Sequence, residues 1–207
     1  MEEGTLCFAH PAYGTLHLSM MGSVQAQNAA LAIKTVEVLR KQGCFVTDDQ
    51  IRAGIESAVW AGRFACISKT PLFYIDGAHN VDAIRQLLAD LVRFYPDMRR
   101  IGIFGVMADK PYRSMAAMAH SVFERIYTVR PDENRALPAE TLAEEIRRAG
   151  GCACAADSVN SAVRRAHAFA EEADGPVLIV AFGSLYYLKE VKHAVYELTT
   201  NGSALIS

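Results

Sequence analysis

Short apolar segments alternate with amphipathic segments along residues 72–198, and this alternation restricts the fold more than any other feature of the sequence. Apolar runs rich in branched and aromatic side chains are typical of buried strands, and apolar residues that recur every three or four positions are typical of helices. Strands that alternate with helices form a mostly parallel sheet with helices on both faces, a Rossmann-like α/β fold. The expected strands are 72–75, 101–106, 125–129, 152–155 and 177–182, and the expected helices are 80–94, 111–121, 138–149, 159–173 and 184–198.

Residues 1–61 have a different organisation. Alternating residues at 14–22 predict an edge strand with no partner nearby in the sequence, and two helices are expected at 23–41 and 48–59, the second opened by a capping box at Thr47–Gln50. These two helices cannot enclose a core alone. We therefore expect a remnant of another domain at 1–61, an α/β domain at 62–198 that begins with a short strand at 64–68, and a tail at 199–207.

Composition narrows the possible functions. Hydrophobic residues make up 51% of the chain and the formal net charge is -2, which predicts a globular protein without electrostatic affinity for nucleic acid or acidic membranes. The sequence has no apolar run of membrane-spanning length and no signal peptide, and its five cysteines lack zinc-binding spacing. We therefore predict a cytoplasmic protein with reduced thiols and no metal site of its own.

The segment from Leu72 to Asn80 predicts a buried strand that runs through a tight turn into a helix capped by Asn80. It places Asp76 and His79 at the carboxyl end of a strand, where open α/β sheets bind nucleotides and other anions. From spacing alone, Asp76 is equally well explained as a ribose or metal ligand and as a turn former. His79 taken alone is more often a structural histidine hydrogen-bonded to the turn.

Other polar residues follow other strands and belong to the same edge of the predicted sheet. Gly183-Ser184 is expected to open a helix and to direct backbone N–H groups and a hydroxyl at an anion, although Ser184 also fits a plain N-cap. Asp109-Lys110 follows the second strand, where a solvated ion pair is the simpler interpretation. Arg63 lies at the domain boundary and could reach a phosphate or stay an exposed linker residue.

Several segments together resemble folylpolyglutamate synthase, including its bifunctional dihydrofolate synthase relatives, within the Mur ligase superfamily. Asp76-Gly-Ala-His-Asn80 is the most specific of them, because the peptidoglycan Mur ligases carry different residues around the aspartate. The other segments are Gln25-x-x-Asn28-Ala29-x-x-Ala32, Trp60-x-Gly62-Arg63, Phe104-Gly-Val-Met107-x-Asp109-Lys110 and Gly183-Ser184-Leu185-Tyr186.

The resemblance implies roles for individual residues. Asn28 would contact adenine, Arg63 would lie near the phosphates, Asp76 would bind the ribose hydroxyls and His79 would lie close to the nucleotide. Ser184, Asp109 and Lys110 are possible contacts for the substrate or the incoming glutamate. The resemblance assigns no catalytic residue and no metal ligand to residues 1–207.

The implied function is that of the C-terminal part of an ATP-dependent ligase. Such a ligase adds L-glutamate to folate or dihydropteroate through an acyl phosphate and requires ATP and Mg²⁺. The phosphate-binding loop, the magnesium ligands and the carbamylated lysine of the family are expected to precede Met1, so the chain alone is expected to be inactive and the full-length enzyme to be a monomer. The alternatives are a stand-alone nucleotide- or amino-acid-binding module and a piece of a peptidoglycan Mur ligase.

Overall fold

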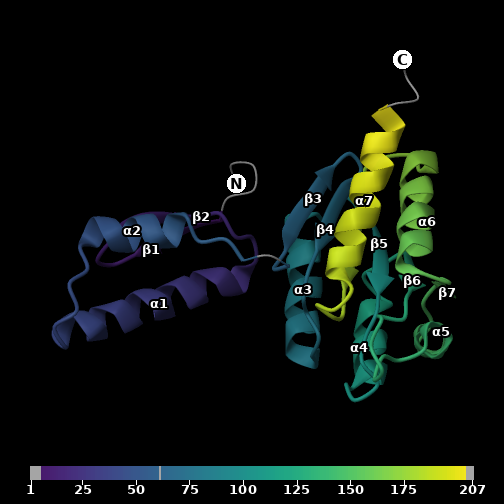
Figure 1. Cartoon of the computed structure of the whole chain (residues 1–207), viewed down its shortest axis with the longest axis horizontal. Helices are drawn as coiled ribbons and strands as arrows, with labels where there is room; N and C mark the ends of the chain where they lie inside the picture. The colour runs from purple at the N-terminus through teal and green to yellow at the C-terminus, as the bar shows by residue number, and fades with distance from the viewer. Residues whose placement is uncertain (1–5, 61, 204–207) are drawn as a thin grey trace. The chain divides into compact units, whose positions relative to one another are not determined.

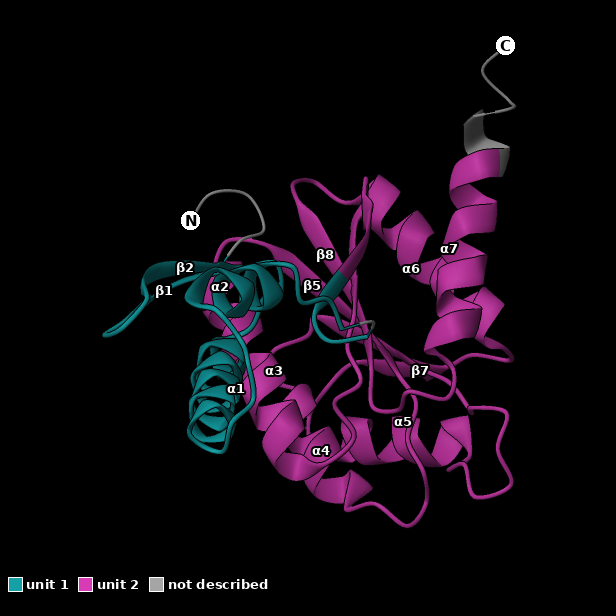
Figure 2. Ribbon diagram, turned by 60° about the vertical axis from the view of Figure 1, so that its left-hand side comes forward, with its two compact units in different colours: residues 1–65 teal, residues 66–207 magenta. Residues whose placement is uncertain are grey.

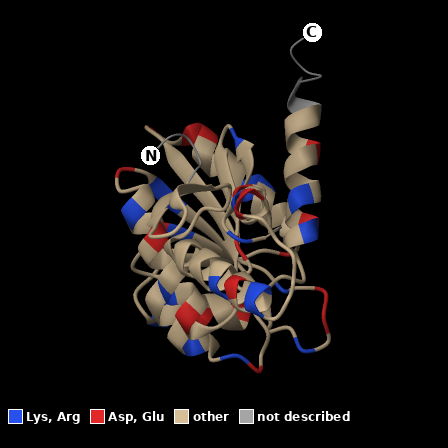
Figure 3. Cartoon of the chain, turned by 90° about the vertical axis from the view of Figure 1, so that its left-hand side faces the viewer, with Lys and Arg blue, Asp and Glu red and all other residues tan. Residues whose placement is uncertain are grey.

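The computed structural model describes residues 6–60 and 62–203, with the side chains of 201–203 left out. The chain forms two compact units, Met1–Ala65 and Cys66–Ser207, called unit 1 and unit 2 below (Figure 2). Among the described residues, no helix is both long and apolar enough to cross a bilayer. Figure 3 shows basic and acidic residues interspersed along the helices and loops.

Unit 1 contains a β-hairpin and two helices. Strands β1 (Leu6–His10) and β2 (Gly14–Leu18) pair antiparallel, and helices α1 (Ser23–Lys41) and α2 (Asp48–Glu56) follow. The prediction that the strand at 14–22 lacks a near partner is wrong, because residues 6–10 pair with it across a turn in which Gly14 adopts a φ of 67°. The capping box predicted for the second helix is confirmed at Thr47 and Gln50.

The hairpin also supplies the core that two helices alone could not form. The buried cluster of unit 1 consists of one hairpin-turn residue, one β2 residue and one residue from each helix: Tyr13, Leu16, Ile33 and Ile51. The alternation in β2 directs Leu16 and Leu18 inward, and both are fully buried.

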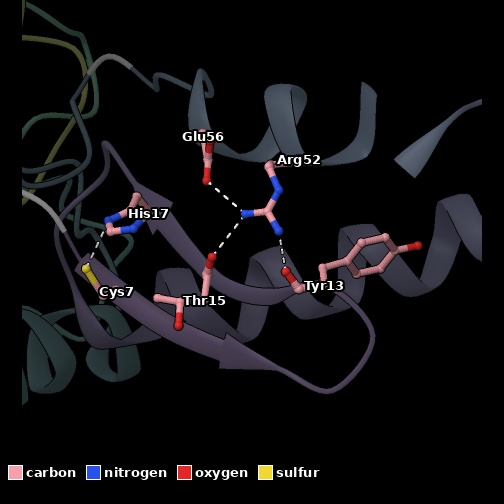
Figure 4. A network of polar contacts seen from close by, with 6 residues as sticks. All are labelled: Cys7, Tyr13, Thr15, His17, Arg52 and Glu56. Carbon is pink, nitrogen blue, oxygen red and sulfur yellow. Dashed lines mark hydrogen bonds and ion pairs between the residues drawn. The ribbon is translucent and has the colours of Figure 1, made fainter. Parts of the chain in front are cut away.

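Arg52 joins α2 to the hairpin (Figure 4). Its guanidinium donates hydrogen bonds to the carbonyl oxygens of Tyr13 and Thr15, the latter at 3.0 Å, and lies 3.4 Å from a carboxylate oxygen of Glu56. The planar guanidinium therefore binds two backbone acceptors and one carboxylate at once, a geometry for which arginine is suited. On the hairpin itself, Cys7 and His17 are cross-strand partners whose Sγ and Nδ1 atoms are 3.3 Å apart.

We expect the Arg52→Ala substitution to loosen the hairpin, because two carbonyl groups lose their donor. Each such hydrogen bond contributes about 1 kcal/mol, so the hairpin amides should exchange with solvent hydrogen about fivefold faster or more. A matched control is Lys34→Ala, which removes an exposed pair with Glu37 and should alter the same amides little. Equal effects of the two substitutions would contradict the role of Arg52.

Unit 2 is built on a six-stranded sheet in the order β3-β4-β8-β5-β6-β7. The four pairings from β4 to β7 along this order are parallel. Only two residues connect β3 to β4, so β3 must run antiparallel to its neighbour at the sheet edge. The strands are β3 (Ala65–Lys69), β4 (Leu72–Ile75), β5 (Arg99–Phe104), β6 (Arg125–Thr128), β7 (Ala153–Ala155) and β8 (Val177–Phe182).

Helices cover both faces of this sheet, as Figure 1 shows. The crossovers from β4 to β5, β5 to β6 and β6 to β7 all run in one direction, so their right-handedness places α3, α4 and α5 on one face. The crossover from β7 back to β8 runs the other way and places α6 on the opposite face, against α7. The predicted mostly parallel α/β fold is confirmed. The helices are α3 (Val81–Phe94), α4 (Tyr112–Ala119), α5 (Ala139–Arg148), α6 (Val159–Glu172) and α7 (Leu188–Ser203).

The last helix differs from its predicted bounds. Residues 184–198 were expected to be helical, yet α7 begins at Leu188 and reaches Ser203. Residues 199–203 of the expected tail therefore belong to the helix, and residues 204–207 lie outside the described residues. The late start of α7 leaves a loop at 183–187 directly after the central strand β8.

Candidate functional site

The carboxyl ends of β4, β8 and β5 form the candidate site of unit 2. The chain leaves β4 and β5 toward the face covered by α3 and α4, and it leaves β8 toward the opposite face covered by α7. Where loops diverge in this way, α/β sheets typically bind their ligands in a crevice at this edge. We call this place the crevice edge.

Asp76 occupies the first position after β4. Its backbone N–H donates to Ala181 O at 2.9 Å and so extends the pairing of β4 with β8 by one residue. Its carboxylate accepts a 2.7 Å hydrogen bond from the N–H of Ala78, and the residue is only 8% exposed. The side chain therefore forms the turn and is held in a fixed orientation at the crevice edge.

His79 and Asn80 complete the same turn. The ring Nδ1 of His79 lies 2.8 Å from Gly77 O, so Nδ1 carries the hydrogen and the second ring nitrogen of a neutral imidazole is an acceptor. Asn80 caps α3 by accepting a 2.8 Å hydrogen bond from Ala83 N, as predicted. The ring of His79 thus has the turn contact typical of a structural histidine, at a half-buried position.

Ser184 lies in the loop before α7 and not at the start of the helix. The prediction that Gly183-Ser184 opens a helix is therefore wrong, because α7 begins four residues later, at Leu188. Its hydroxyl accepts a 3.2 Å hydrogen bond from Tyr186 N, and the residue is 2% exposed. The serine stabilises a turn within the loop.

Tyr187 holds this loop in place. Its hydroxyl lies 2.9 Å from Ile103 O and 2.5 Å from Phe182 O, at the ends of β5 and β8. Complete burial raises the pKa of this phenol, so the hydroxyl stays a hydrogen-bond donor. Next to it, Gly183 has a φ of 105° and no room for a Cβ, which would lie 2.5 Å from Phe104 Cδ2. The backbones after β5 and β8 therefore approach each other closely.

A charged cluster forms at the crevice edge from loops after β5, β6 and β8. One carboxylate oxygen of Asp109 lies 3.6 Å from both Lys110 Nζ and Arg135 Nη1. Arg135 also donates a 3.2 Å hydrogen bond to the hydroxyl of Tyr186, whose ring centroid is 5.8 Å from the guanidinium carbon. The hydrogen bond with Tyr186 and the charge of Asp109 raise the pKa of the Arg135 guanidinium.

Sequence reasoning missed Arg135. It follows no strand directly and belongs to the irregular segment between β6 and α5, so no periodic pattern singles it out. The segment is fixed by hydrogen bonds from Ala108 N to Arg135 O and from Leu137 N to Val106 O, at 2.8 and 2.9 Å. A basic residue in a loop that follows a parallel strand was the only available signal.

The remaining predicted residues lie in unit 1. Asn28 is exposed on α1 and donates a 3.2 Å hydrogen bond to the side-chain oxygen of Gln25. Arg63 is half-buried and follows Gly62, which has a φ of 82°. The sheet edge of unit 2 thus collects five of the seven predicted site residues, and Asn28 and Arg63 belong to the other unit.

The described residues do not offer a metal site. No group of three or more histidine, cysteine, aspartate or glutamate side chains among residues 6–60 and 62–203 is arranged to hold an ion. The described residues therefore form no cluster that would hold a Mg²⁺ ion by protein ligands alone.

Together, the parallel sheet, the carboxylate-bearing turn after β4 and the close approach of β5 and β8 define a domain of Rossmann-like fold. The family described as Mur ligase, glutamate ligase domain, matches residues 62–185, and the chain belongs to this family.

Relatives support this assignment and refine it. The dihydrofolate synthase/folylpolyglutamate synthase of Bacillus subtilis is 29% identical over 184 residues, which is 87% of this chain and 41% of the relative. A crystal structure of Mycobacterium tuberculosis folylpolyglutamate synthase with ADP and AMPPCP superimposes with a TM-score of 0.77 at 27% identity, covering 89% of this chain and 42% of that one. E. coli FolC with DHPP and ADP gives 0.72 at 26% identity, covering 97% and 47%.

These comparisons confirm the resemblance to folylpolyglutamate and dihydrofolate synthases. The chain spans less than half the length of each of these relatives.

Proposed function

We propose that this chain is the C-terminal part of an ATP-dependent ligase that adds L-glutamate to folate or dihydropteroate. The observation that carries the proposal is the Asp76–Asn80 turn, which lies at the crevice edge of a domain whose relatives are named folylpolyglutamate synthases. Two of these relatives have been solved with adenine nucleotides. The folate branch of the family is therefore favoured over the peptidoglycan branch.

The nucleotide is assigned to the turn after β4. The buried carboxylate of Asp76 accepts hydrogen bonds from the ribose hydroxyls, and His79 lies close to the nucleotide. A carboxylate already oriented by its own turn loses little freedom when it binds, which favours affinity. Asn28 contacts adenine and Arg63 approaches the phosphates in this proposal, both from unit 1.

The incoming amino acid is assigned to the charged cluster. Arg135 and Lys110 offer cations for its carboxylates, while Asp109 attracts its ammonium group and Ser184 lies on the loop beside them. The acceptor carboxylate first attacks the γ-phosphate of ATP, giving an acyl phosphate and ADP. The glutamate amine, after losing a proton, then attacks the acyl carbon, and phosphate leaves.

Positioning is the contribution proposed for this domain. An acyl phosphate hydrolyses in water, so a domain that closes over the nucleotide and holds the amine near the acyl carbon favours ligation over hydrolysis. The sequence contains no Gly-x-x-x-x-Gly-Lys-Ser/Thr loop for the triphosphate, so we propose that these 207 residues alone do not turn over ATP. The complete enzyme is proposed to be a cytoplasmic monomer.

The test is a ligase assay on the gene product that contains these residues, with MgATP, L-glutamate and either dihydropteroate or tetrahydrofolate. We expect ADP formation that depends on both the acceptor and glutamate. ADP formation with a nucleotide-linked muramyl acceptor instead would overturn the folate assignment. Nucleotide binding without turnover under any of these conditions would favour a binding module.

We expect Arg135→Gln to raise the KM for L-glutamate about tenfold, because a charge-assisted hydrogen bond to a carboxylate is lost. The KM for ATP should stay within about twofold of the original value. Arg113→Gln provides the matched control, since Arg113 is an exposed arginine paired with Glu145 on the helices of the same unit. A glutamate KM that responds equally to both substitutions would argue against the charged cluster.

A further inference from the structure

A groove separate from the crevice edge lies between α7 and the edge strand β3. Its volume is about 490 Å³, and one residue of β3 and six of α7 line it: Ile67, Lys189, Lys192, His193, Val195, Tyr196 and Thr199. All of them belong to unit 2. We call this feature the α7–β3 groove.

One wall of the groove carries only basic charge. Lys189, Lys192 and His193 line it, and no acidic side chain does. Within the part of the chain that the structure describes, neither lysine forms an ion pair, whereas His193 lies 3.5 Å from Glu197, one helical turn further on. Two lysines without a partner on one wall favour an occupant with several negative charges.

Apolar and aromatic side chains also line the groove. Ile67 is half-buried on β3, Val195 is buried, and Tyr196 is 66% exposed. Because β3 is the edge strand, its outer side also presents backbone groups that no strand of the sheet pairs. Methylene groups, carboxylates and amides would each find a complementary surface here.

The groove leads away from the crevice edge. α7 starts immediately after the loop that carries Ser184 and runs back along the sheet, as Figure 1 shows. From Lys189 to Thr199 the helix advances about 15 Å, roughly the length of two or three repeats of an extended γ-linked glutamate chain, in which each repeat has two more main-chain bonds than an α-peptide residue. A linear chain that emerges from the crevice edge can therefore follow the helix over this distance.

We propose that the α7–β3 groove binds an oligoglutamate chain, the γ-linked tail that a polyglutamate-forming ligase extends. Lys189 and Lys192 pair with successive side carboxylates, and Ile67 and Tyr196 contact the methylene groups between them. The proposal rests on the proposed function, because only a ligase that adds glutamate repeatedly makes such a chain. In this proposal the groove binds the glutamate residues already linked to the folate, whereas the charged cluster binds the glutamate that is added next.

The test is a titration of the isotope-labelled 207-residue chain with γ-linked tetraglutamate, followed by NMR. We expect saturable shifts of the backbone amides of Lys189, Lys192 and Tyr196, and weaker binding in high salt. The double variant Lys189→Gln/Lys192→Gln should weaken binding about fivefold to tenfold, the effect of losing two exposed ion pairs. The control Lys41→Gln/Arg93→Gln removes the same charge from exposed positions on α1 and α3 and should leave binding within twofold.

Two outcomes would overturn the proposal. One is the absence of saturable shifts in the α7–β3 groove, or shifts that the double variant leaves unchanged. The other is equal affinity for free L-glutamate or inorganic phosphate, which would mean that the lysines attract any anion and that a chain is not recognised. A parallel titration with ADP separates this test from the proposed function, and it uses the gene product that contains these residues, because the 207 residues lack the phosphate-binding loop. ADP binding to that protein without tetraglutamate binding removes the groove alone. Tetraglutamate binding without ADP binding removes the nucleotide site alone.

Discussion

Replacing Gly183 by alanine should destabilise unit 2 by about 3 kcal/mol or more, a large part of the stability of a typical domain. Two penalties add. The φ of 105° is a conformation that residues with a Cβ rarely adopt, and the new Cβ would lie 2.5 Å from Phe104 Cδ2 and closer still to Gly105 O. The nearest backbone atom cannot move without separating β5 from β8, the two central strands. Chemical denaturation followed by circular dichroism measures the loss.

Gly175 is a matched control for this substitution. Its φ of 103° is nearly the same, but a Cβ there would meet nothing within 4 Å. Gly175→Ala should therefore show the backbone penalty alone, about 1–2 kcal/mol. If both substitutions cost the same, the contact with Phe104 and Gly105 would not matter. If the contacts of the new Cβ matter, Gly183→Ala should lower the free energy of unfolding more than Gly175→Ala does.

The sheet was predictable because its strands are buried on both sides. β8 consists entirely of buried apolar residues, so six consecutive positions of the sequence identify a central strand. The helices followed from the spacing of apolar residues, as in α3, where Ile84, Leu88 and Leu91 are buried. For such elements the local pattern and the tertiary environment agree.

The hairpin of unit 1 was missed for the opposite reason. Residues of β1 alternate only between half-buried and exposed, and they include Cys7 and His10, so the pattern is weak. The sequence pattern therefore predicted β2 but not β1, the strand with which it pairs. The late start of α7 was hidden because Tyr187, Leu188 and Val191 continue a helical apolar pattern backward into the loop. Hydrogen bonds from Tyr187 to the ends of β5 and β8 hold residues 183–187 as a loop. The bond to Ile103 joins residues far apart in the sequence, so a local pattern does not predict it.

The candidate site was predictable only where a strand ends in a distinctive turn. Asp76 and His79 are only three positions apart in the sequence, and their turn contacts are local. Arg135 is joined to Asp109 and Tyr186 by the pairing of three loops, and no local pattern contains this information. Charged clusters of this kind become visible only once the topology of the sheet is known.

The Asp76→Ala substitution should raise the KM for ATP about tenfold or more in the gene product that contains these residues, with a smaller change in the KM for L-glutamate. The loss of a hydrogen bond to a charged group accounts for an effect of this size. The substitution also removes the acceptor for Ala78 N, which by itself loosens the turn. A second variant is needed to separate the two roles.

Asp76→Asn provides that separation. The amide oxygen can still accept from Ala78 N and keep the turn, but it lacks the charge and offers a single acceptor atom for the two ribose hydroxyls. If the carboxylate binds ribose, this variant should keep the stability of the original protein and still raise the KM for ATP. Asp82→Asn, at an exposed position in the first turn of α3, should change neither quantity. A KM for ATP that follows stability alone would mean that Asp76 only forms the turn, and the nucleotide would then have to be held by other residues.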